Sequence, residues 1–306
     1  MTGVLHFASE VETALRDGRP VVALESTLIT HGLPRPENAA TALAMEAAVR
    51  ESGAVPATIA VLAGCITVGL SREQIEDLAH RPFGSVRKCS RRDLPIVVAR
   101  AEDGATTVAG TMIVAHHAGI RVFGTGGIGG VHRGAPFDVS ADLIELGRTP
   151  VAVVCAGPKA ILDLPLTMEV LETHGVPVVG LGTDTLPGFY TRSSGLPIDV
   201  RVETPRDAAE IIAAAERMDA RHGVLIVVPV PASDESAGDV DEAIERAVAD
   251  AEAQGIRGKA VTPFLLTRVS ELTSGASLRA NQALLVHNAR TAGLNARELS
   301  GLRMKN

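Results

Sequence analysis

Short apolar runs rich in β-branched residues alternate with longer segments of helical periodicity along the whole chain. Most of these runs are continuous and do not alternate with polar positions, which is typical of strands covered on both faces of a sheet. The runs that we predict to be strands are Val21–Leu24, Thr58–Leu62, Ile96–Ala99, Val122–Gly124, Val151–Val154, Val178–Gly180 and Val224–Val228. Strands that alternate with helices predict an α/β protein with a mainly parallel, mixed central sheet.

Capping signals mark where several of the predicted helices begin. Side chains that can accept a hydrogen bond from a free backbone N–H stand before apolar periodic segments, in two cases directly before a proline. The predicted caps are Asn38, Ser71 with Gln74, Thr204 before Pro205, and Thr262 before Pro263. Helices of this kind between the apolar runs support the α/β prediction.

The composition suits one large folded unit. Hydrophobic residues make up 46% of the 306 residues, and the mean hydropathy is +0.21. No repeat, low-complexity tract or linker interrupts the pattern. We therefore predict a single domain over residues 1–306.

The net charge, the cysteines and the length of the apolar runs limit the expected partners and cellular location of the protein. A net charge of −7 and an aromatic content of 2% argue against nucleic acid as a partner. Three scattered cysteines (Cys65, Cys89 and Cys155) suit a reducing compartment. The N-terminus lacks the basic start of a signal peptide, and no stretch approaches the roughly 18 apolar residues of a membrane span. We expect a cytoplasmic protein without a membrane partner.

Polar residues gather directly after three of the predicted strands. Glu25 follows the strand Val21–Leu24, and Lys159 closes the segment after Val151–Val154. In an open α/β sheet, ligands bind beyond the carboxyl ends of the strands, so we expect these residues at one site. The third strand is followed by a glycine-rich loop.

This loop, Thr125–Gly134, holds five glycines in ten residues. Glycines let backbone N–H groups approach an anion closely, and His132 and Arg133 add donors. The spacing matches neither the P-loop nor the dinucleotide-binding motif. The loop is therefore either an anion site or a tight structural turn.

Lys159 is the second feature with a chemical interpretation. We predict that it opens a helix over Ala160–Thr173. A place at the positive end of a helix and burial both favour the neutral amine, as a Schiff-base nucleophile requires. A solvated lysine on the first turn of a helix is the alternative.

Four other charged residues each allow two interpretations. Glu25 could act as a general acid or as a cap partner in a polar loop. Asp138 and Asp142 could hold Mg²⁺ or Mn²⁺ through one carboxylate and waters, although Ser140 with Asp142 also suits an ordinary helix start. Lys88, in a basic cluster, could contact an anion or lie in a solvated loop.

Longer motifs distinguish between these alternatives. They are Ala23–Thr27, Gly53–Ala60, Ser90–Pro95, Gly104–Val108, Thr125–Gly134, Val154–Gly157 with Lys159, and Thr262–Leu266. In this order, from about residue 20 to residue 290, they resemble the pseudouridine-5′-phosphate glycosidase family. The resemblance implies an α/β/α sandwich, a homotrimer, and the reversible cleavage of pseudouridine 5′-phosphate with water into uracil and ribose 5-phosphate. It also implies a divalent metal, typically Mn²⁺.

The resemblance also implies a role for individual residues. Lys159 would be the nucleophile, Glu25 the proton donor and Asp138 the metal ligand. The implied substrate-binding residues are Lys88, Val108, His132, Ser140, Ala141, Asp142 and Asn281. One departure is that the segment from Gly134 to Asp138 is about two residues shorter than the usual family loop.

The implied chemistry suits these residue types. A C–C glycosidic bond has no leaving heteroatom to protonate, so a pair of carboxylates gives little help. Opening the ribose ring creates an electrophilic carbon that an amine can capture as a Schiff base, and protonation at uracil C5 then releases the base. Two alternatives use the same residues, namely a Schiff-base lyase or aldolase on another sugar phosphate and a sugar-phosphate sensor without catalysis.

Overall fold

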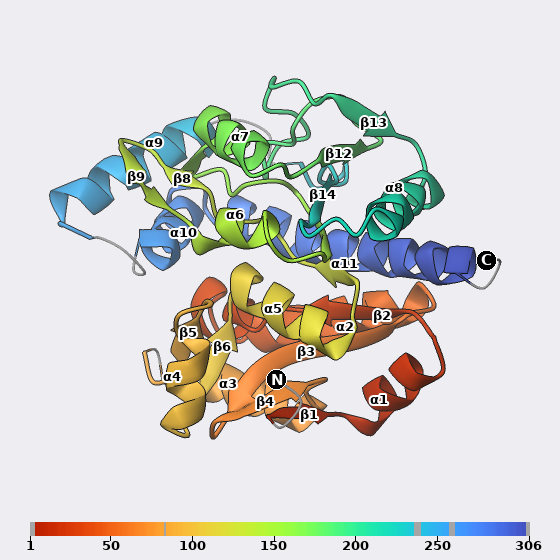
Figure 1. Cartoon of the computed structure of the whole chain (residues 1–306). Coiled ribbons are helices and arrows are strands. Elements are labelled where there is room, and N and C mark those ends of the chain that lie inside the picture. The colour runs from red at the N-terminus through yellow and green to blue at the C-terminus, as the bar shows by residue number, and fades with distance from the viewer. Residues whose placement is uncertain (1–3, 83, 236–239, 257–260, 304–306) are drawn as a thin grey trace.

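One large sheet runs through the computed structural model, which describes residues 4–82, 84–235, 240–256 and 261–303. Helices cover both faces of this sheet, and the long C-terminal helix α11 (Ala276–Arg303) lies across one of them (Figure 1). In spatial order, the strands along the sheet are β1 (Leu5–Phe7), β4 (Cys65–Val68), β3 (Val55–Leu62), β2 (Val21–Leu24), β7 (Val122–Gly124), β10 (Ala152–Cys155), β14 (Val224–Val227), β12 (Val178–Leu181) and β13 (Val200–Val202). Strand β6 (Gly104–Thr106) also pairs with β3, and β5 (Arg87–Cys89) pairs with β6.

Parallel pairing dominates this sheet. The pairs from β3 through β2, β7, β10, β14 and β12 to β13 are all parallel, whereas β4 and β6 lie antiparallel to β3. The predicted mainly parallel, mixed sheet is confirmed. Six of the seven predicted strands are present, two of them (β2 and β7) with the predicted bounds.

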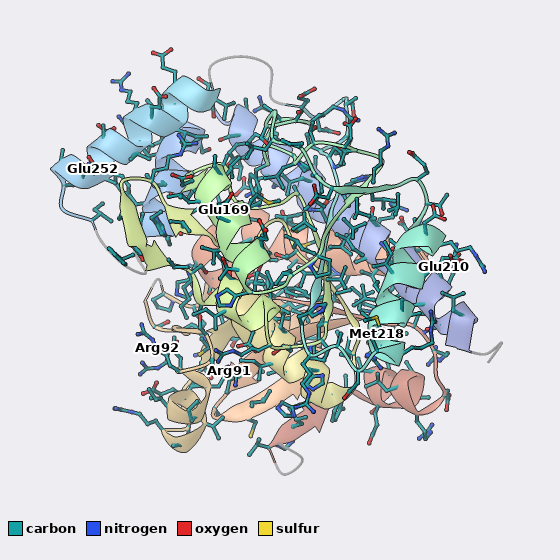
Figure 2. All side chains as sticks on the ribbon, turned by 45° about the horizontal axis from the view of Figure 1, so that its top comes forward. Arg91, Arg92, Glu169, Glu210, Met218 and Glu252 are labelled. Carbon is teal, nitrogen blue, oxygen red and sulfur yellow. The ribbon has the colours of Figure 1, made fainter. Side chains whose placement is uncertain are left out.

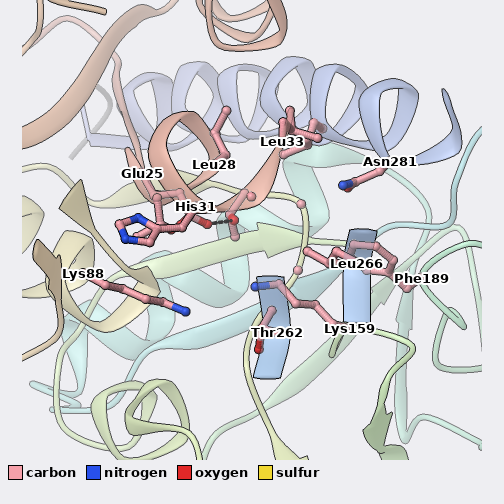
Figure 3. A pocket seen from close by; sticks show the side chains of 16 residues that line it. Glu25, Leu28, His31, Leu33, Lys88, Lys159, Phe189, Thr262, Leu266 and Asn281 are labelled. Carbon is pink, nitrogen blue, oxygen red and sulfur yellow. Dashed lines mark hydrogen bonds between the residues drawn. The ribbon is translucent and has the colours of Figure 1, made fainter. Parts of the chain in front are cut away.

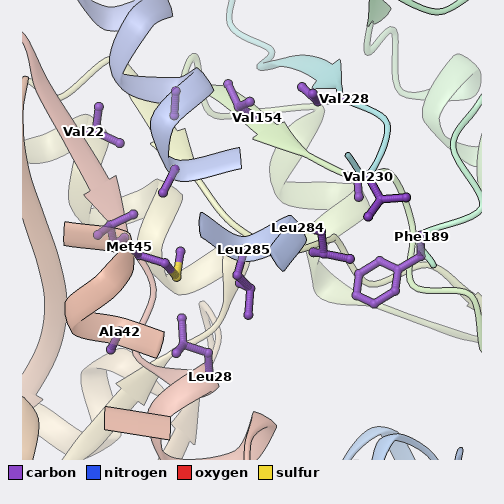
Figure 4. Close-up of a cluster of buried hydrophobic side chains, with 14 of the residues drawn as sticks. Val22, Leu28, Ala42, Met45, Val154, Phe189, Val228, Val230, Leu284 and Leu285 are labelled. Atoms are coloured by element: carbon purple, nitrogen blue, oxygen red, sulfur yellow. The ribbon is translucent and has the colours of Figure 1, made fainter. Parts of the chain in front are cut away.

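Two hydrophobic cores lie on opposite faces of the sheet. Along β2, Val22 and Leu24 enter one core with side chains from α2 (Glu37–Glu51), α8 (Pro205–Arg217) and α11. Figure 4 shows Val22 in this core with Met45 and Leu285. Val21 and Ala23 enter the other core with side chains from α1 (Ser9–Arg16), α5 (Val108–Ala118) and α6 (Ala141–Leu146). Apolar side chains therefore occupy every position of the strand, which explains the continuous runs and confirms the α/β/α sandwich.

Twelve helices are found in the described ranges. They are α1 (Ser9–Arg16), the π-helical turn η1 (Leu28–Gly32), α2 (Glu37–Glu51), α3 (Arg72–His80), α4 (Leu94–Ala99), α5 (Val108–Ala118), α6 (Ala141–Leu146), α7 (Leu164–Thr173), α8 (Pro205–Arg217), α9 (Val240–Ala253), α10 (Val261–Leu272) and α11 (Ala276–Arg303). None of the helices in this part of the chain is long and apolar enough to cross a membrane.

The strand predicted at Ile96–Ala99 is wrong, because these residues form most of helix α4. Leu94 and Val97, three residues apart, are buried, whereas Ile96 is 41% exposed. This spacing is helical, and Pro95 stands at the start of the helix, where its fixed φ is favourable. A short apolar run does not by itself distinguish a strand from a helix.

The predicted caps have mixed outcomes. Ser71 forms the predicted capping box with Gln74, and Thr204 caps α8. Asn38 lies inside α2, and its buried amide donates to the carbonyls of Ile29 (2.7 Å) and Ala79 (3.2 Å). Asn38 therefore fastens α2 to two neighbouring segments and does not cap it. Thr262 also lies inside its helix, since α10 begins at Val261.

Candidate active site

The carboxyl ends of three adjacent parallel strands deliver the predicted reactive residues. Glu25 follows β2, the glycine-rich loop follows β7, and Lys159 lies four residues beyond β10. Because β7 pairs with both β2 and β10, these ends meet at one edge of the sheet. The expectation that they form one site is confirmed.

Two adjoining hollows occupy this edge. The outer cavity, of about 640 Å³, is lined by all but one of the predicted site residues. These are Glu25, Lys88, Val108, His132, Asp138, Ser140, Ala141, Asp142 and Lys159. The inner pocket, of about 50 Å³, shares Glu25, Lys88 and Lys159 with the outer cavity and contains the remaining residue, Asn281. Figure 3 shows Lys88 and Lys159 reaching into the inner pocket from opposite sides.

Glu25 is a buried carboxylate held by two hydroxyl groups. Its side chain is 6% exposed, the Thr27 hydroxyl donates to Oε2, and the Thr125 hydroxyl donates to Oε1 at 2.5 Å. The next residue, Ser26, donates to the carbonyl of Ile59 at 2.7 Å and anchors the turn. Glu25 is therefore fixed in one orientation toward both hollows.

Lys159 lies in a loop and not at the start of a helix, so the helix predicted over Ala160–Thr173 is wrong in its first part. The short strand β11 (Leu162–Asp163) follows Lys159, and α7 begins only at Leu164, with the Asp163 side chain as its cap. The backbone N–H of Lys159 donates to the carbonyl of Ile128 at 3.1 Å. A backbone bond to the glycine-rich loop thus holds Lys159, and the positive end of a helix does not.

The glycines of the loop are explained largely by close packing. A Cβ atom on Gly127 would lie 2.7 Å from the carbonyl oxygen of Gly157, and one on Gly129 would overlap Ser140. One on Gly130 would overlap Thr167. The N–H groups of Ile128, Gly129 and Val131 donate to acceptors within the protein. These contacts favour the structural-turn interpretation for the second half of the loop.

Asp142 holds this loop in place. Its Oδ2 accepts from the N–H of Gly129 at 2.9 Å, and its Oδ1 accepts from the N–H of Ala109 at 3.0 Å in the first turn of α5. Ser140 caps α6 by accepting from the N–H of Asp142 at 3.2 Å. Both Asp142 oxygens are thus committed to backbone groups, so its carboxylate shapes the cavity wall beside Val108.

His132 lies in a small second sheet that borders the outer cavity. Its strand β8 (Val131–His132) pairs with β11 and with β9 (Ala135–Val139). Burial lowers the pKa of His132, the negative charge of Asp138 opposes this, and the positive charges of Lys88 and Lys159 lower the pKa further. His132 is therefore mainly neutral at neutral pH.

Arginines add positive charge around the outer cavity. Arg91 forms two bonds to the buried carboxylate of Glu145, at 2.8 and 2.6 Å. Arg92 and Arg148 also line this cavity, and Figure 2 shows Arg91 and Arg92 at the surface of the molecule. Glu145 balances the charge of Arg91, so Arg92 and Arg148 are the arginines of this cavity wall that a bound anion could contact.

Asp138 is exposed on β9, at the wall of the outer cavity. Among the described residues, no group of three or more His, Cys, Asp or Glu side chains is placed to hold a metal ion. The neighbouring acids, Asp142 and Glu145, already bind backbone groups and Arg91. A cation bound here would therefore have to take one carboxylate from the protein and its other ligands from water and substrate, as Mg²⁺ commonly does.

Sequence reasoning missed several lining residues. Thr27 and Thr125 each stand just after a buried strand, the same signal that identified Glu25, but a lone threonine there has no distinctive chemistry. His31 and Phe189 line the inner pocket from a π-helical turn and a loop, and no spacing rule indicates either of them. Asn281 was implied only by resemblance.

Comparison with known proteins agrees with this geometry. The sequence profile described as "Indigoidine synthase A like protein" matches residues 10–298. Two proteins named pseudouridine-5′-phosphate glycosidase, from Hahella chejuensis and Clostridium botulinum, are 54% and 53% identical to the chain. The alignments cover 95% and 97% of this chain and 97% and 98% of those proteins.

Two solved structures are also similar. The prealnumycin C-glycosynthase AlnA, in complex with ribulose 5-phosphate, has a TM-score of 0.90 and 40% identity, with 99% of each chain covered. An indigoidine synthase A-like protein from Thermotoga maritima has a TM-score of 0.88 and 36% identity, with 97% of each chain covered. The chain belongs to the indigoidine synthase A-like family, in which it groups with proteins named pseudouridine-5′-phosphate glycosidase.

Proposed function

We propose that this protein is a glycosidase that cleaves the C–C glycosidic bond of pseudouridine 5′-phosphate, reversibly, to give uracil and ribose 5-phosphate. Relatives with that name share more than half of their residues with it over nearly the whole chain. The observation that carries the proposal is that Lys159 and the buried Glu25 line the same cavity. An amine and a single carboxylate suit a C-glycoside better than the two carboxylates of ordinary glycosidases.

Lys159 supplies the nucleophile in the proposed reaction. The C1′–O4′ bond breaks as O4′ takes a proton, and the Lys159 amine forms a bond to C1′. A proton then goes to uracil C5, the nitrogen lone pair forms a C=N bond, and the C1′–C5 bond breaks, so uracil leaves. Water adds to the C=N bond and releases ribose 5-phosphate and the free amine.

Glu25 is suited to both proton transfers. It lies in the same two hollows as Lys159, and the hydroxyls of Thr27 and Thr125 hold its oxygens. Cys155 is the last residue of β10, four residues before Lys159. It does not compete as a nucleophile, because burial raises the pKa of its thiol to about 12. The chemistry therefore rests on the lysine.

The two hollows suit the two ends of the substrate. Apolar side chains of the inner pocket, among them Leu28 and Phe189, would cover the faces of uracil, and the amide of Asn281 would bind a polar edge of the base. Lys88 and a neutral His132, which both line the outer cavity, would donate hydrogen bonds to the phosphate. That AlnA binds ribulose 5-phosphate supports a sugar phosphate as ligand of this fold.

Metal, assembly and location complete the proposal. Asp138 would hold a divalent cation, typically Mn²⁺, which supplies positive charge to substrate oxygens when bound. The homotrimer is supported by the family resemblance. A cytoplasmic location is supported by the three free cysteines.

The test is product analysis with matched variants. Purified protein with Mn²⁺ should release uracil from pseudouridine 5′-phosphate and much less from pseudouridine, which has no phosphate. Lys159→Ala should fold and lose essentially all release, and Lys159→Arg should do no better, because a guanidinium stays protonated. Borohydride with ribose 5-phosphate should leave a mass adduct on the Lys159 peptide. An aldolase on another sugar phosphate would release no uracil, a sensor would bind without turnover, and an active Lys159→Ala enzyme would refute the covalent mechanism.

A further inference from the structure

Helix α11 contacts the catalytic edge of the sheet through one buried asparagine. Asn288 is 0% exposed, and its Nδ2 donates to the carbonyl of Thr125 at 2.9 Å and to that of Gly126 at 3.2 Å. The helix lies so close that a Cβ on Gly124 would be 3.3 Å from the Cα of Ala289. The Asn288 amide therefore binds the backbone of Thr125, the residue whose hydroxyl binds Glu25.

Thr125 is the link between this amide and the acid. Its N–H donates to the carbonyl of Val154 at 3.0 Å, and its hydroxyl donates to Glu25 Oε1 at 2.5 Å. Bonds on both backbone groups fix the peptide planes on either side of Thr125, and thus the direction of its hydroxyl. The series Asn288, Thr125, Glu25 is continuous, and each bond in it is buried.

The orientation of the amide indicates what it is for. Asn288 Oδ1 is buried and has no hydrogen-bond partner among the described residues. Only the donor end of the amide serves the structure, and it serves the loop that carries Thr125.

We propose that Asn288 is a positioning residue for catalysis, which acts through Thr125 to hold Glu25 in the orientation that transfers protons. The inference rests on the proposed function of Glu25. Asn288 lines neither hollow, so it would act on the rate and not on substrate binding. Without its bonds the Thr125 hydroxyl turns, and Glu25 samples unproductive orientations.

Asn295 provides a matched control on the same helix. It is also 0% exposed, its Nδ2 donates to the carbonyl of Thr291 at 3.0 Å within α11, and its Oδ1 is likewise without a partner among the described residues. Asn295→Ala removes the same buried amide without touching the catalytic loop. It should lower the Tm and leave kcat unchanged.

The decisive experiment compares steady-state uracil release by wild type, Asn288→Ala and Asn295→Ala. Asn288→Ala should lower kcat by about tenfold or more with little change in KM, because a misplaced proton donor slows chemistry without weakening binding. Asn288→Ser, which keeps one donor, should recover part of the rate, and it should be compared with Asn295→Ser if the alanine variant does not fold. Normal kcat in a folded Asn288 variant would overturn the inference.

A double-mutant cycle tests whether Asn288 acts through Thr125. Thr125→Val removes the hydroxyl that binds Glu25 and keeps the shape of the side chain. If both residues act on Glu25 in series, the double variant should lose little more than the worse single variant. Additive losses would contradict the proposal. Wild type that releases no uracil would instead refute the proposed function itself.

Discussion

At the residue scale, the site places one exposed carboxylate beside two lysines and a histidine. Asp138 lines a cavity wall together with Lys88, His132 and Lys159. The charges of Asp138 and the two lysines each affect the pKa of His132. The substrate adds a phosphate to this group. Exchange of a single charge here should therefore change metal binding or proton binding before it changes the fold.

Asp138→Asn should weaken Mn²⁺ binding and activity together, each by about tenfold or more, because it removes the carboxylate proposed to hold the ion. Titration calorimetry with Mn²⁺ measures the binding directly. A chelator should reduce wild-type uracil release to a similar extent. Glu172→Gln, an exposed acid on α7 that lines neither hollow, is the control and should keep both properties. Normal Mn²⁺ affinity in the Asp138 variant would place the ion elsewhere.

His132 should make stability depend on pH in a defined direction. Because burial and the lysines lower its pKa, the folded protein binds fewer protons than the unfolded chain just below the ordinary histidine range. Stability contributed by neutral His132 is present above that range and is lost as the pH falls through it. Between about pH 7 and pH 5, the Tm of His132→Gln should fall less than that of wild type. Parallel Tm curves would show that His132 titrates normally.

At the scale of elements, helix α11 packs against both α2 and the catalytic edge of the sheet. Gly293 of this helix faces the end of α2, where an added Cβ would overlap the Ser52 hydroxyl and lie 2.9 Å from Ser52 Cβ. Ser52 itself is buried and donates to the carbonyl of Val49 at 2.6 Å. The contact leaves no room for a side chain and sets the distance between α2 and α11.

Gly293→Ala should destabilise the protein by about 1–3 kcal/mol, because overpacking exceeds the gain in helix propensity. Gly301→Ala is the matched control, since it lies in the same helix with no described atom within 4 Å of the added Cβ. The control should be neutral or more stable by at most about 1 kcal/mol. Urea denaturation measures both differences, and equal stabilities of the two variants would show that α2 and α11 move apart freely.

At the scale of the whole molecule, the proposed trimer has a direct test. Light scattering coupled to size exclusion should give three times the chain mass of 31.8 kDa. A monomer or dimer mass across a range of protein concentrations would contradict the trimer. The prediction of one domain over residues 1–306 likewise stays a prediction, although the main sheet includes strands from Leu5 to Val227.

The sequence by itself determined the local features of this protein. Continuous apolar runs identified six strands, because a strand buried on both faces is apolar at every position. Polar residues after strand ends identified Glu25 and Lys159, because ligands bind beyond the carboxyl ends of the strands. Longer motifs identified the family. Where a run was short, as at Ile96–Ala99, local pattern was insufficient, since both a strand and a helix bury such a run.

Only the tertiary structure decided which distant residues act together. In the sequence, Asp142 was a candidate metal or substrate ligand with a helix start as the alternative, and Asn288 carried no prediction. In the structure, Asp142 binds Gly129 and Asn288 binds Thr125. Close neighbours such as Ser140 leave no room for a side chain at several loop glycines. Lys159 is held by a backbone hydrogen bond to Ile128 and not by a helix end. Hydrogen bonds and close contacts between different elements leave no periodic trace, because they depend on how the elements pack and not on their local sequence.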